Sequence, residues 1–278
     1  MPTAMAAPYL PIKFHTPFIT YSMNTLQLSV NDRLATVTLN RGRSNPINLE
    51  MINELITTVK DLEADDNIGG LIITGKEGFF SAGIDLIEAY GYDRDQSKEF
   101  WTSFLLMQST LSAFKKPFVT AITGHSPAGG CIIAMCSDYR VMANGQFIIG
   151  LNEVPVGIIV PGAVFHLYAF WLGTRKAYQY LLEGKLLNVE EALKDGLIDE
   201  VCDPEDVLAA AEKKVRQYMK LNPATWSRSK LNLRSELHSQ MQKENSETLD
   251  KMLQQWWSPE TRSTLQKMID KLTNPVKK

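Results

Sequence analysis

Short apolar runs separated by segments of helical character are the feature of this sequence that most constrains its fold. A run bounded by glycine or proline is typical of a strand buried on both faces of a sheet. Segments at Phe100–Phe114 and Gly129–Cys136 have the composition of helices and separate these runs. The alternation predicts an α/β core. The runs lie at Gly70–Gly75, Pro117–Ile122, Asp138–Ala143 and Gln146–Gly150.

The patterning also suggests where the core begins and ends. Leu26–Val30 and Leu34–Leu39 alternate in polarity and predict a β-hairpin, and apolar residues at helical spacing follow Asn48. Residues 1–22 hold several prolines and no acidic residue, so we expect a flexible leader. Residues 23–204 are the predicted α/β core. Residues 205–278 are a predicted C-terminal helical region.

Composition excludes several classes of protein. The 278 residues are 44% hydrophobic and 22% charged, with a net charge of -2, as in ordinary globular domains. No basic run predicts a nucleic-acid partner, and no apolar stretch is long enough to span a membrane. The cysteines, Cys131, Cys136 and Cys202, lack zinc-site spacing, so we expect no metal and a reducing compartment.

Two glycine-containing turns follow predicted strands, at Phe79–Asp85 and at Gly124–Gly130. The second turn leads directly into a helix at Cys131, where backbone N–H groups lack intrahelical acceptors. Two N–H groups from different turns can together stabilise one developing oxyanion. For each turn alone, an ordinary tight turn in an α/β sheet is the favoured interpretation.

Glu153 lies in an apolar stretch, Ile149–Ile158, directly after a predicted strand. A carboxyl group in apolar surroundings has a raised pKa and can exchange protons near neutral pH. Glu153 is therefore a candidate acid–base residue. The alternative is a surface glutamate in a turn.

The motifs together resemble the signature of the crotonase (enoyl-CoA hydratase/isomerase) superfamily. Phe80–Leu86, Pro127–Cys131 and Ile149–Glu153 match it in order and spacing, and the similarity runs from about Met23 to Pro204. The resemblance is strongest to mitochondrial-type 3-enoyl-CoA to 2-enoyl-CoA isomerases. It implies a spiral of ββα units, with C-terminal helices that build homotrimers, often paired into homohexamers.

The resemblance also implies roles for individual residues. It implies an oxyanion hole for the thioester carbonyl from the backbone N–H groups of Ile84 and Gly129, with Glu153 as the proton carrier. No cofactor is expected, because coenzyme A enters as part of the acyl-CoA substrate. The residues implied in holding coenzyme A are Ser44, Asn45, Ile47 and Ala82.

Ile132 departs from the hydratases of this superfamily, which have a second glutamate at the corresponding position. Addition of water needs an acid and a base, so one acid favours double-bond isomerisation. We interpret Asp138 as a structural residue at a strand start and Asp85 as a turn or cap residue. The alternatives are a hydratase or another crotonase-type reaction, and a non-catalytic acyl-CoA-binding protein on the same fold.

Several further expectations concern surroundings and location. Large aromatic residues in the C-terminal region, Trp226, Trp256 and Trp257, either cover the core or face another subunit.

The chain ends in Pro275–Lys278 without a peroxisomal signal, so we expect a cytoplasmic protein, with the mitochondrial matrix as the alternative. Candidate pocket walls, which are equally good core residues, are Phe100, Trp101, Phe104, Phe165 and Trp171.

Overall fold

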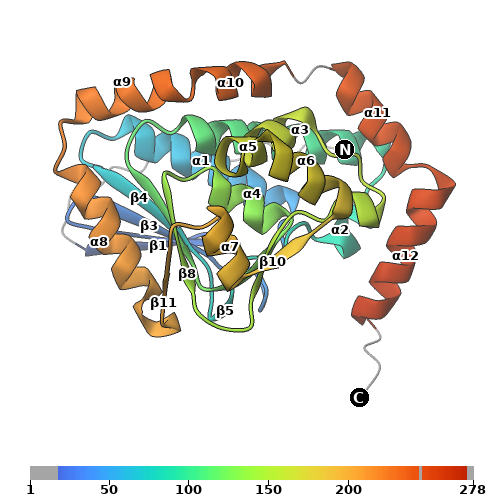
Figure 1. The fold of residues 1–278 in the computed structure, drawn as a ribbon, viewed down its shortest axis with the longest axis horizontal. Helices are drawn as coiled ribbons and strands as arrows, with labels where there is room; N and C mark the ends of the chain where they lie inside the picture. The colour runs from blue at the N-terminus through green and yellow to red at the C-terminus, as the bar shows by residue number, and fades with distance from the viewer. Residues whose placement is uncertain (1–17, 244–245, 274–278) are drawn as a thin grey trace, which may run out of the picture.

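The computed structural model describes residues 18–243 and 246–273, and the strands of its main sheet lie on the left in Figure 1. Within these residues the sheet has seven strands in the order β1-β2-β3-β4-β6-β8-β11. Pairing is antiparallel from β1 to β3 and parallel from β3 onward. The strands are β1 (Phe18–Ser22), β2 (Leu26–Asn31), β3 (Leu34–Leu39), β4 (Gly70–Thr74), β6 (Phe118–Ile122), β8 (Tyr139–Ala143) and β11 (Glu200–Cys202).

A second, smaller sheet has the order β10-β9-β7-β5 in the described part of the chain. The chain passes from β4 to β5, from β6 to β7 and from β8 to β9, so each turn of the spiral gives one strand to each sheet. The predicted α/β spiral is thereby confirmed. The strands of this sheet are β5 (Gly78–Phe79), β7 (Gly124–Pro127), β9 (Ile148–Gly150) and β10 (Leu186–Asn188).

Two glycines allow the chain to cross between the sheets. A Cβ atom on Gly75 would lie 2.4 Å from Cα of Phe80, and one on Gly124 would lie 2.1 Å from the carbonyl carbon of Gly78. Both contacts are with backbone, so no side-chain movement would relieve them. The crossings therefore require glycine because the backbones approach too closely for a side chain.

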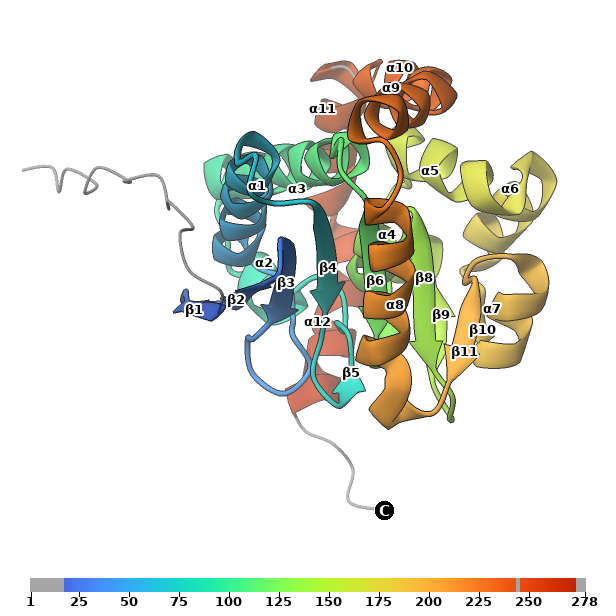
Figure 2. The same ribbon diagram turned by 90° about the vertical axis from the view of Figure 1, so that its left-hand side faces the viewer.

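The central strands are apolar along their whole length because both faces of the main sheet are covered. Leu71 and Ile73 of β4 pack on the side of α1 (Leu49–Ala64) and α3 (Arg94–Ala113). Ile72, between them, packs with α8 (Val207–Met219) on the other side. Figure 2 shows α8 in front of β6 and β8.

Local capping explains where the larger helices begin. Asn48 caps α1 by accepting a hydrogen bond from the Met51 N–H at 3.0 Å. Asp93 and Gln96 form a capping box, so α3 begins at Arg94 rather than at the predicted Phe100. The remaining helices of the core are α2 (Leu86–Tyr90), α4 (Gly129–Met135), η1 (Val154–Val156), α5 (Gly162–Leu172), α6 (Thr174–Glu183), α7 (Val189–Asp195) and η2 (Pro204–Asp206).

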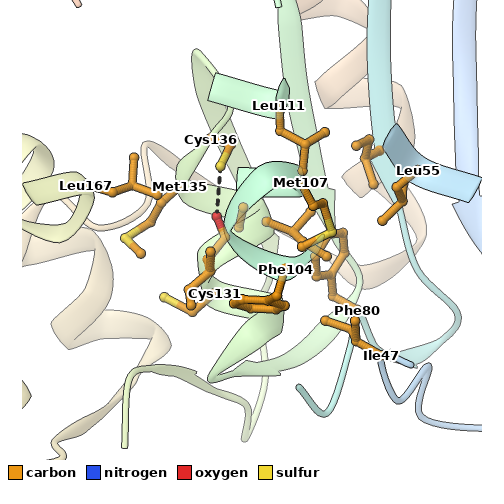
Figure 3. Packing of buried hydrophobic residues seen from close by; sticks show 14 of the residues in the cluster. Ile47, Leu55, Phe80, Phe104, Met107, Leu111, Cys131, Met135, Cys136 and Leu167 are labelled. Carbon is orange, nitrogen blue, oxygen red and sulfur yellow. Dashed lines mark hydrogen bonds between the residues drawn. The ribbon is translucent and has the colours of Figure 1, made fainter. Parts of the chain in front are cut away.

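The core is centred on α4, whose residues are all buried. Figure 3 shows Cys131, Met135 and Cys136 surrounded by apolar side chains from several elements. Cys136 Sγ donates to the Ile132 carbonyl at 3.3 Å, and both Cys131 and Cys136 are free and buried. These cysteines are therefore packing residues.

Two observations refine the predicted domain limits. Phe18–Ser22, which we expected to belong to a flexible leader, form β1 and pair with β2, while residues 1–17 lie outside the described part of the chain. Helix α8, which we placed in the C-terminal helical region, packs on the main sheet through Val207, Ala211 and Val215. The core thus extends beyond residue 204.

The C-terminal helices pack along the core and then descend at its right-hand edge in Figure 1. Lys230 Nζ donates to Asp138 Oδ2 at 2.8 Å, and Arg234 Nη1 donates to the Cys136 carbonyl at 2.9 Å. No described helix is both long and apolar enough to cross a membrane. The helices are α9 (Pro223–Leu233), α10 (Ser235–Gln242), α11 (Ser246–Trp256) and α12 (Pro259–Thr273).

Candidate active site

A cavity of about 400 Å³ brings together residues from all three sequence motifs. It contains the predicted Ser44, Ala82, Ile84, Gly129 and Glu153. A larger cavity of about 670 Å³, between α1, α8 and α9, holds none of the predicted site residues, and charge pairs such as Lys115–Glu63 lie along it. The smaller cavity is therefore the candidate active site. Its other lining residues are Pro46, Asp85, Leu86, Ile87, Trp101, Phe104, Pro127, Ala128, Ile132, Asn152, Val156, Ile158, Pro161, Val164, Met268 and Leu272.

The three candidate chemical groups follow three neighbouring strands of the second sheet. Strands β5, β7 and β9 are parallel and adjacent. Ile84, Gly129 and Glu153 come shortly after the carboxyl ends of these strands. Because the ends of parallel neighbours meet at one edge of a sheet, residues far apart in the sequence converge here.

Two hydrogen bonds with Ile47 hold the backbone around Ile84 so that the Ile84 N–H points away from the segment that contains Ile47. Ile47 N–H donates to the Gly83 carbonyl at 2.8 Å, and Asp85 N–H donates to the Ile47 carbonyl at 2.8 Å. Successive residues of an extended segment direct their N–H groups to opposite sides. The Ile84 N–H therefore faces the other way, and it has no hydrogen-bond acceptor among residues 18–243 and 246–273.

Gly129 presents a second N–H at the start of α4, where no intrahelical acceptor exists, and this N–H has no acceptor in the part of the chain that the structure describes. The preceding Ala128 has φ 50° and ψ -120°, a conformation that costs a residue with a side chain on the order of 1–3 kcal/mol. A Cβ atom on Gly129 would lie 3.5 Å from the Ile84 nitrogen. The strained turn therefore brings two free N–H groups into one small space.

Glu153 is held in the cavity wall with its side chain largely removed from water. It is 9% exposed, and Oε2 has no hydrogen-bond partner in the described chain. Burial raises the pKa of its carboxyl from 4.5 to about 7, against a lowering by the backbone N–H of Glu153 itself. Its carbonyl accepts from the N–H groups of Val156 at 3.1 Å and Ile158 at 3.0 Å, so the backbone is fixed. The surface-turn alternative is wrong.

Ile132 lies on the same wall as the acid. It is 2% exposed and lines the cavity from the first turn of α4. Its side chain therefore faces the site rather than the opposite side of the helix. The wall beside Glu153 is apolar at this point.

Asn45 and Ile47 lie beneath the cavity rather than in its wall. Both are fully buried, and Asn45 Nδ2 donates to the Phe80 carbonyl at 3.0 Å. The terminal carbon of Ile47 would lie 2.9 Å from a Cβ atom on Gly129. Their side chains hold the two turns together, whereas Ser44 and Ala82 reach the cavity.

The two nearby aspartates have structural partners, as we interpreted them. Asp138 Oδ2 accepts from the Phe118 N–H at 2.8 Å and pairs with Lys230. Asp85 caps α2 through the Glu88 N–H at 3.0 Å and pairs with Arg41 at 2.6 Å. Neither is needed to explain the cavity chemistry.

The cavity wall differs in part from the aromatic residues that we named. Trp101 and Phe104 line it, but Phe100, Phe165 and Trp171 do not. Trp171 instead stacks on Arg140, with the guanidinium 3.7 Å from the ring centroid. Trp256 is 3% exposed and packs on Trp101, so this tryptophan covers the core of its own chain.

Met268 and Leu272 of α12 were missed by the sequence reasoning. Their only signal is the helical spacing of Leu265, Met268, Ile269 and Leu272. That spacing predicts an apolar helix face but not the surface that it covers. The C-terminal helix is thus part of the site, a contact that no motif indicated.

Comparison with known proteins agrees with this geometry. A family model described as enoyl-CoA hydratase/isomerase matches residues 29–275. Enoyl-CoA delta isomerase 1, mitochondrial, from Mus musculus is 39% identical over 66% of this chain and 63% of its own length. The corresponding Rattus norvegicus protein is 36% identical over 81% of this chain and 77% of its own length. The chain therefore spans somewhat less than two thirds of the mouse relative.

Solved structures are similar over most of the chain. Human mitochondrial delta3-delta2-enoyl-CoA isomerase has a TM-score of 0.86 at 27% identity, over 90% of this chain and 98% of its own. An enoyl-CoA hydratase from Mycobacterium ulcerans has a TM-score of 0.76 at 26% identity, over 84% of this chain and 100% of its own. With a family model that matches almost the whole chain, we conclude that the protein belongs to the enoyl-CoA hydratase/isomerase family.

Proposed function

We propose that this protein is an isomerase that moves the double bond of unsaturated fatty acyl-CoA from carbon 3 to carbon 2. The observation that carries the proposal is one buried carboxyl, Glu153, beside an apolar Ile132 and the free N–H groups of Ile84 and Gly129. The names of the mammalian relatives support the same reaction.

In the proposed mechanism, the thioester oxygen accepts hydrogen bonds from the N–H groups of Ile84 and Gly129. Glu153 removes a proton from carbon 2, and the electron pair moves into the thioester as an enolate. Mutational losses of about 3–4 kcal/mol per donor in other oxyanion holes give the scale of this stabilisation. The enolate electron pair then returns to form the double bond between carbons 2 and 3. The pair of the former double bond between carbons 3 and 4 takes the proton from Glu153 at carbon 4. The substrate and product are isomers, so no other reactant is consumed.

The raised pKa of Glu153 suits a carboxyl that both takes and returns a proton. A carboxyl with a pKa of about 7 is a stronger base than an ordinary glutamate and is still partly ionised at neutral pH. No resident cofactor is needed in this scheme, because coenzyme A arrives with the acyl group. Ser44 and Ala82, at the cavity edge, are the proposed contacts to coenzyme A.

Hydration is the main rival, since several relatives and solved structures bear hydratase names. Hydration needs a held water molecule and a second acid–base group. Ile132 can neither donate nor accept a proton, and the aspartates nearby are already paired. This favours isomerisation.

Two assays on the purified protein separate these reactions. We expect turnover of 3-enoyl-CoA to exceed hydration of 2-enoyl-CoA by at least about 100-fold, the lower range of a general acid–base contribution. Ile132→Glu should add slow hydration, with Ile132→Leu as the matched control that adds none. Efficient hydration by the wild-type protein would overturn the assignment.

A non-catalytic acyl-CoA-binding role is the second alternative. A protein that only binds acyl-CoA has no use for a buried carboxyl with an unpartnered oxygen, Glu153 Oε2, because such burial costs stability. Measurable acyl-CoA affinity without turnover of 3-enoyl-CoA or 2-enoyl-CoA would favour this alternative.

The assembly and the compartment are further parts of the proposal. Phe170, Leu221 and Leu233 are 41%, 52% and 75% exposed around one apolar groove of about 500 Å³. We propose that copies of this chain associate there, as a homotrimer or homohexamer.

The mitochondrial names of the mammalian relatives favour the mitochondrial matrix over the cytoplasm that we expected from the sequence. Fractionation of the host cell tests this location.

A further inference from the structure

The lining of the active-site cavity has an exposed end and a buried end. At one end, Leu272 of α12 is 62% exposed and Ile87 of α2 is 51% exposed. At the other end, Trp101 is 4% exposed and Phe104 is 1% exposed. The mouth of the cavity therefore lies beside α2 and α12, and its base is formed by α3.

This gradient fixes the direction in which an acyl-CoA lies. Coenzyme A is large and charged, so it remains at the mouth. A thioester oxygen bound at Ile84 and Gly129 then sends the acyl chain inward past Glu153. The carbons beyond the reacting ones pass the apolar wall at Ile132 and Val164 and reach the base.

Trp101 is held in place at the base. Its ring packs edge-on against Trp256 with 5.6 Å between centroids, and against Phe100 at 5.4 Å. Trp256 is itself buried at the end of α11. Figure 3 shows the neighbouring Phe104 among the side chains packed around α4. A ring enclosed in this way has little room to move aside for a longer chain.

We propose that Trp101, supported by Trp256, is a specificity-determining residue that sets the longest acyl chain this site accepts. The proposal rests on the proposed function for the direction of the substrate. The cavity volume of about 400 Å³ is near the lower end of ligand sites, about 300–1,000 Å³. Short and medium unsaturated acyl chains are therefore the preferred substrates.

Binding of saturated acyl-CoAs tests the proposal without any turnover. Calorimetry with butyryl-, octanoyl-, dodecanoyl- and palmitoyl-CoA measures affinity against chain length. Each methylene that enters the apolar wall should tighten binding about fourfold. In the wild type we expect the affinity to rise and then level off where the chain meets Trp101. In Trp101→Leu the rise should continue to longer chains.

Further variants keep the test decisive. Trp256→Leu removes the support without touching the cavity and should shift the plateau in the same direction by less. Phe114→Leu, a buried aromatic on the same chain segment that packs on Phe118, is the matched control with an unchanged plateau. If Trp101→Leu fails to fold, Trp101→Phe takes its place with a smaller expected shift.

Two results would overturn the proposal: identical plateaus in the wild type and the Trp101 variant, or a wild-type affinity that still rises through palmitoyl-CoA. If the plateau shifts in the Trp101 variant but the wild-type protein has no isomerase activity, the proposed reaction is refuted and the role of Trp101 in limiting chain length is supported. The two proposals therefore fail separately.

Discussion

Glu153 combines a chemical role with a cost to stability in one side chain. Its carboxyl is buried and its pKa is raised from 4.5 to about 7. An unfolded chain releases this proton near pH 4.5, whereas the folded protein retains it until about pH 7. The folded state therefore loses stability as pH rises between these values, by about 3 kcal/mol in total.

Glu153→Gln should separate activity from stability. We expect isomerisation to fall by about 100-fold to 10,000-fold, because the amide cannot carry a proton. At pH 8 the variant should be more stable to urea than the wild type, by up to about 3 kcal/mol, and this difference should vanish near pH 4. In the wild type, kcat/KM should rise with pH through about 7. Activity within tenfold of the wild type would refute a role for Glu153 as the proton carrier.

Gly129→Val tests the proposed oxyanion hole. The new side chain would meet the terminal carbon of Ile47 and stand between the two N–H groups. We expect kcat/KM to fall by at least about 100-fold. Circular dichroism checks the fold, and Gly91→Ala, whose new Cβ would make only a 3.4 Å contact, is the control. Normal turnover by a folded Gly129→Val protein would show that the hole is misplaced.

Residues with distinctive chemistry were the easiest to find from the sequence. Glu153, Ile84 and Gly129 lie in motifs where glycine or a lone acid interrupts an apolar pattern, and the structure brings them to one cavity. Ile47 has no such distinction, and its buried packing role depends on neighbours that the sequence does not specify. The sequence pattern indicates which residues are buried, but the residues against which they pack depend on the fold.

At the scale of elements, the sequence likewise predicted where strands lie but not which strands they pair with. The apolar runs predicted β4, β6 and β8 closely, because burial on both faces leaves a clear pattern. They did not show that β9 belongs to the second sheet, since pairing partners have no local signature. β1 was missed because its residues, FITYS, lie beside a proline-rich segment that suggested a loose leader.

Helix α12 connects the part of the candidate site around Ile84 with the part around Glu153. Arg262 Nη2 donates to the Tyr90 carbonyl at 2.7 Å, and its guanidinium lies 3.4 Å from the Tyr90 ring centroid. Thr261 Oγ1 donates to the Gly157 carbonyl at 3.2 Å. The helix thus contacts α2, which follows Ile84, and η1, which follows Glu153.

Arg262→Met should loosen this connection. Methionine keeps the apolar stem but loses the hydrogen bond and the ring contact. We expect kcat/KM to fall roughly tenfold through a higher KM and a lower kcat, because small displacements of positioned groups reduce rate steeply. Lys267→Met, at an exposed position of the same helix, is the control. Unchanged kinetics would show that α12 is only a cover.

At the scale of the whole molecule, the groove lined by Phe170, Leu221 and Leu233 predicts association. Exposed apolar surface of this kind commonly marks an interface. Sedimentation of the intact protein should show a trimer or hexamer, and Leu233→Glu should reduce its size. Leu193→Glu, which changes an exposed apolar residue on α7, should leave it unchanged. A monomer in the intact protein would refute the proposed assembly.

The spiral also bears on how reactions diversify on this scaffold. Ile84, Gly129 and Glu153 follow β5, β7 and β9, which are equivalent strands in successive coils. Each coil thus contributes its own functional group to the same cavity, and one group can be exchanged while the others keep their positions. A change of reaction on such a scaffold needs substitutions in a single coil, so one architecture can carry both isomerases and hydratases.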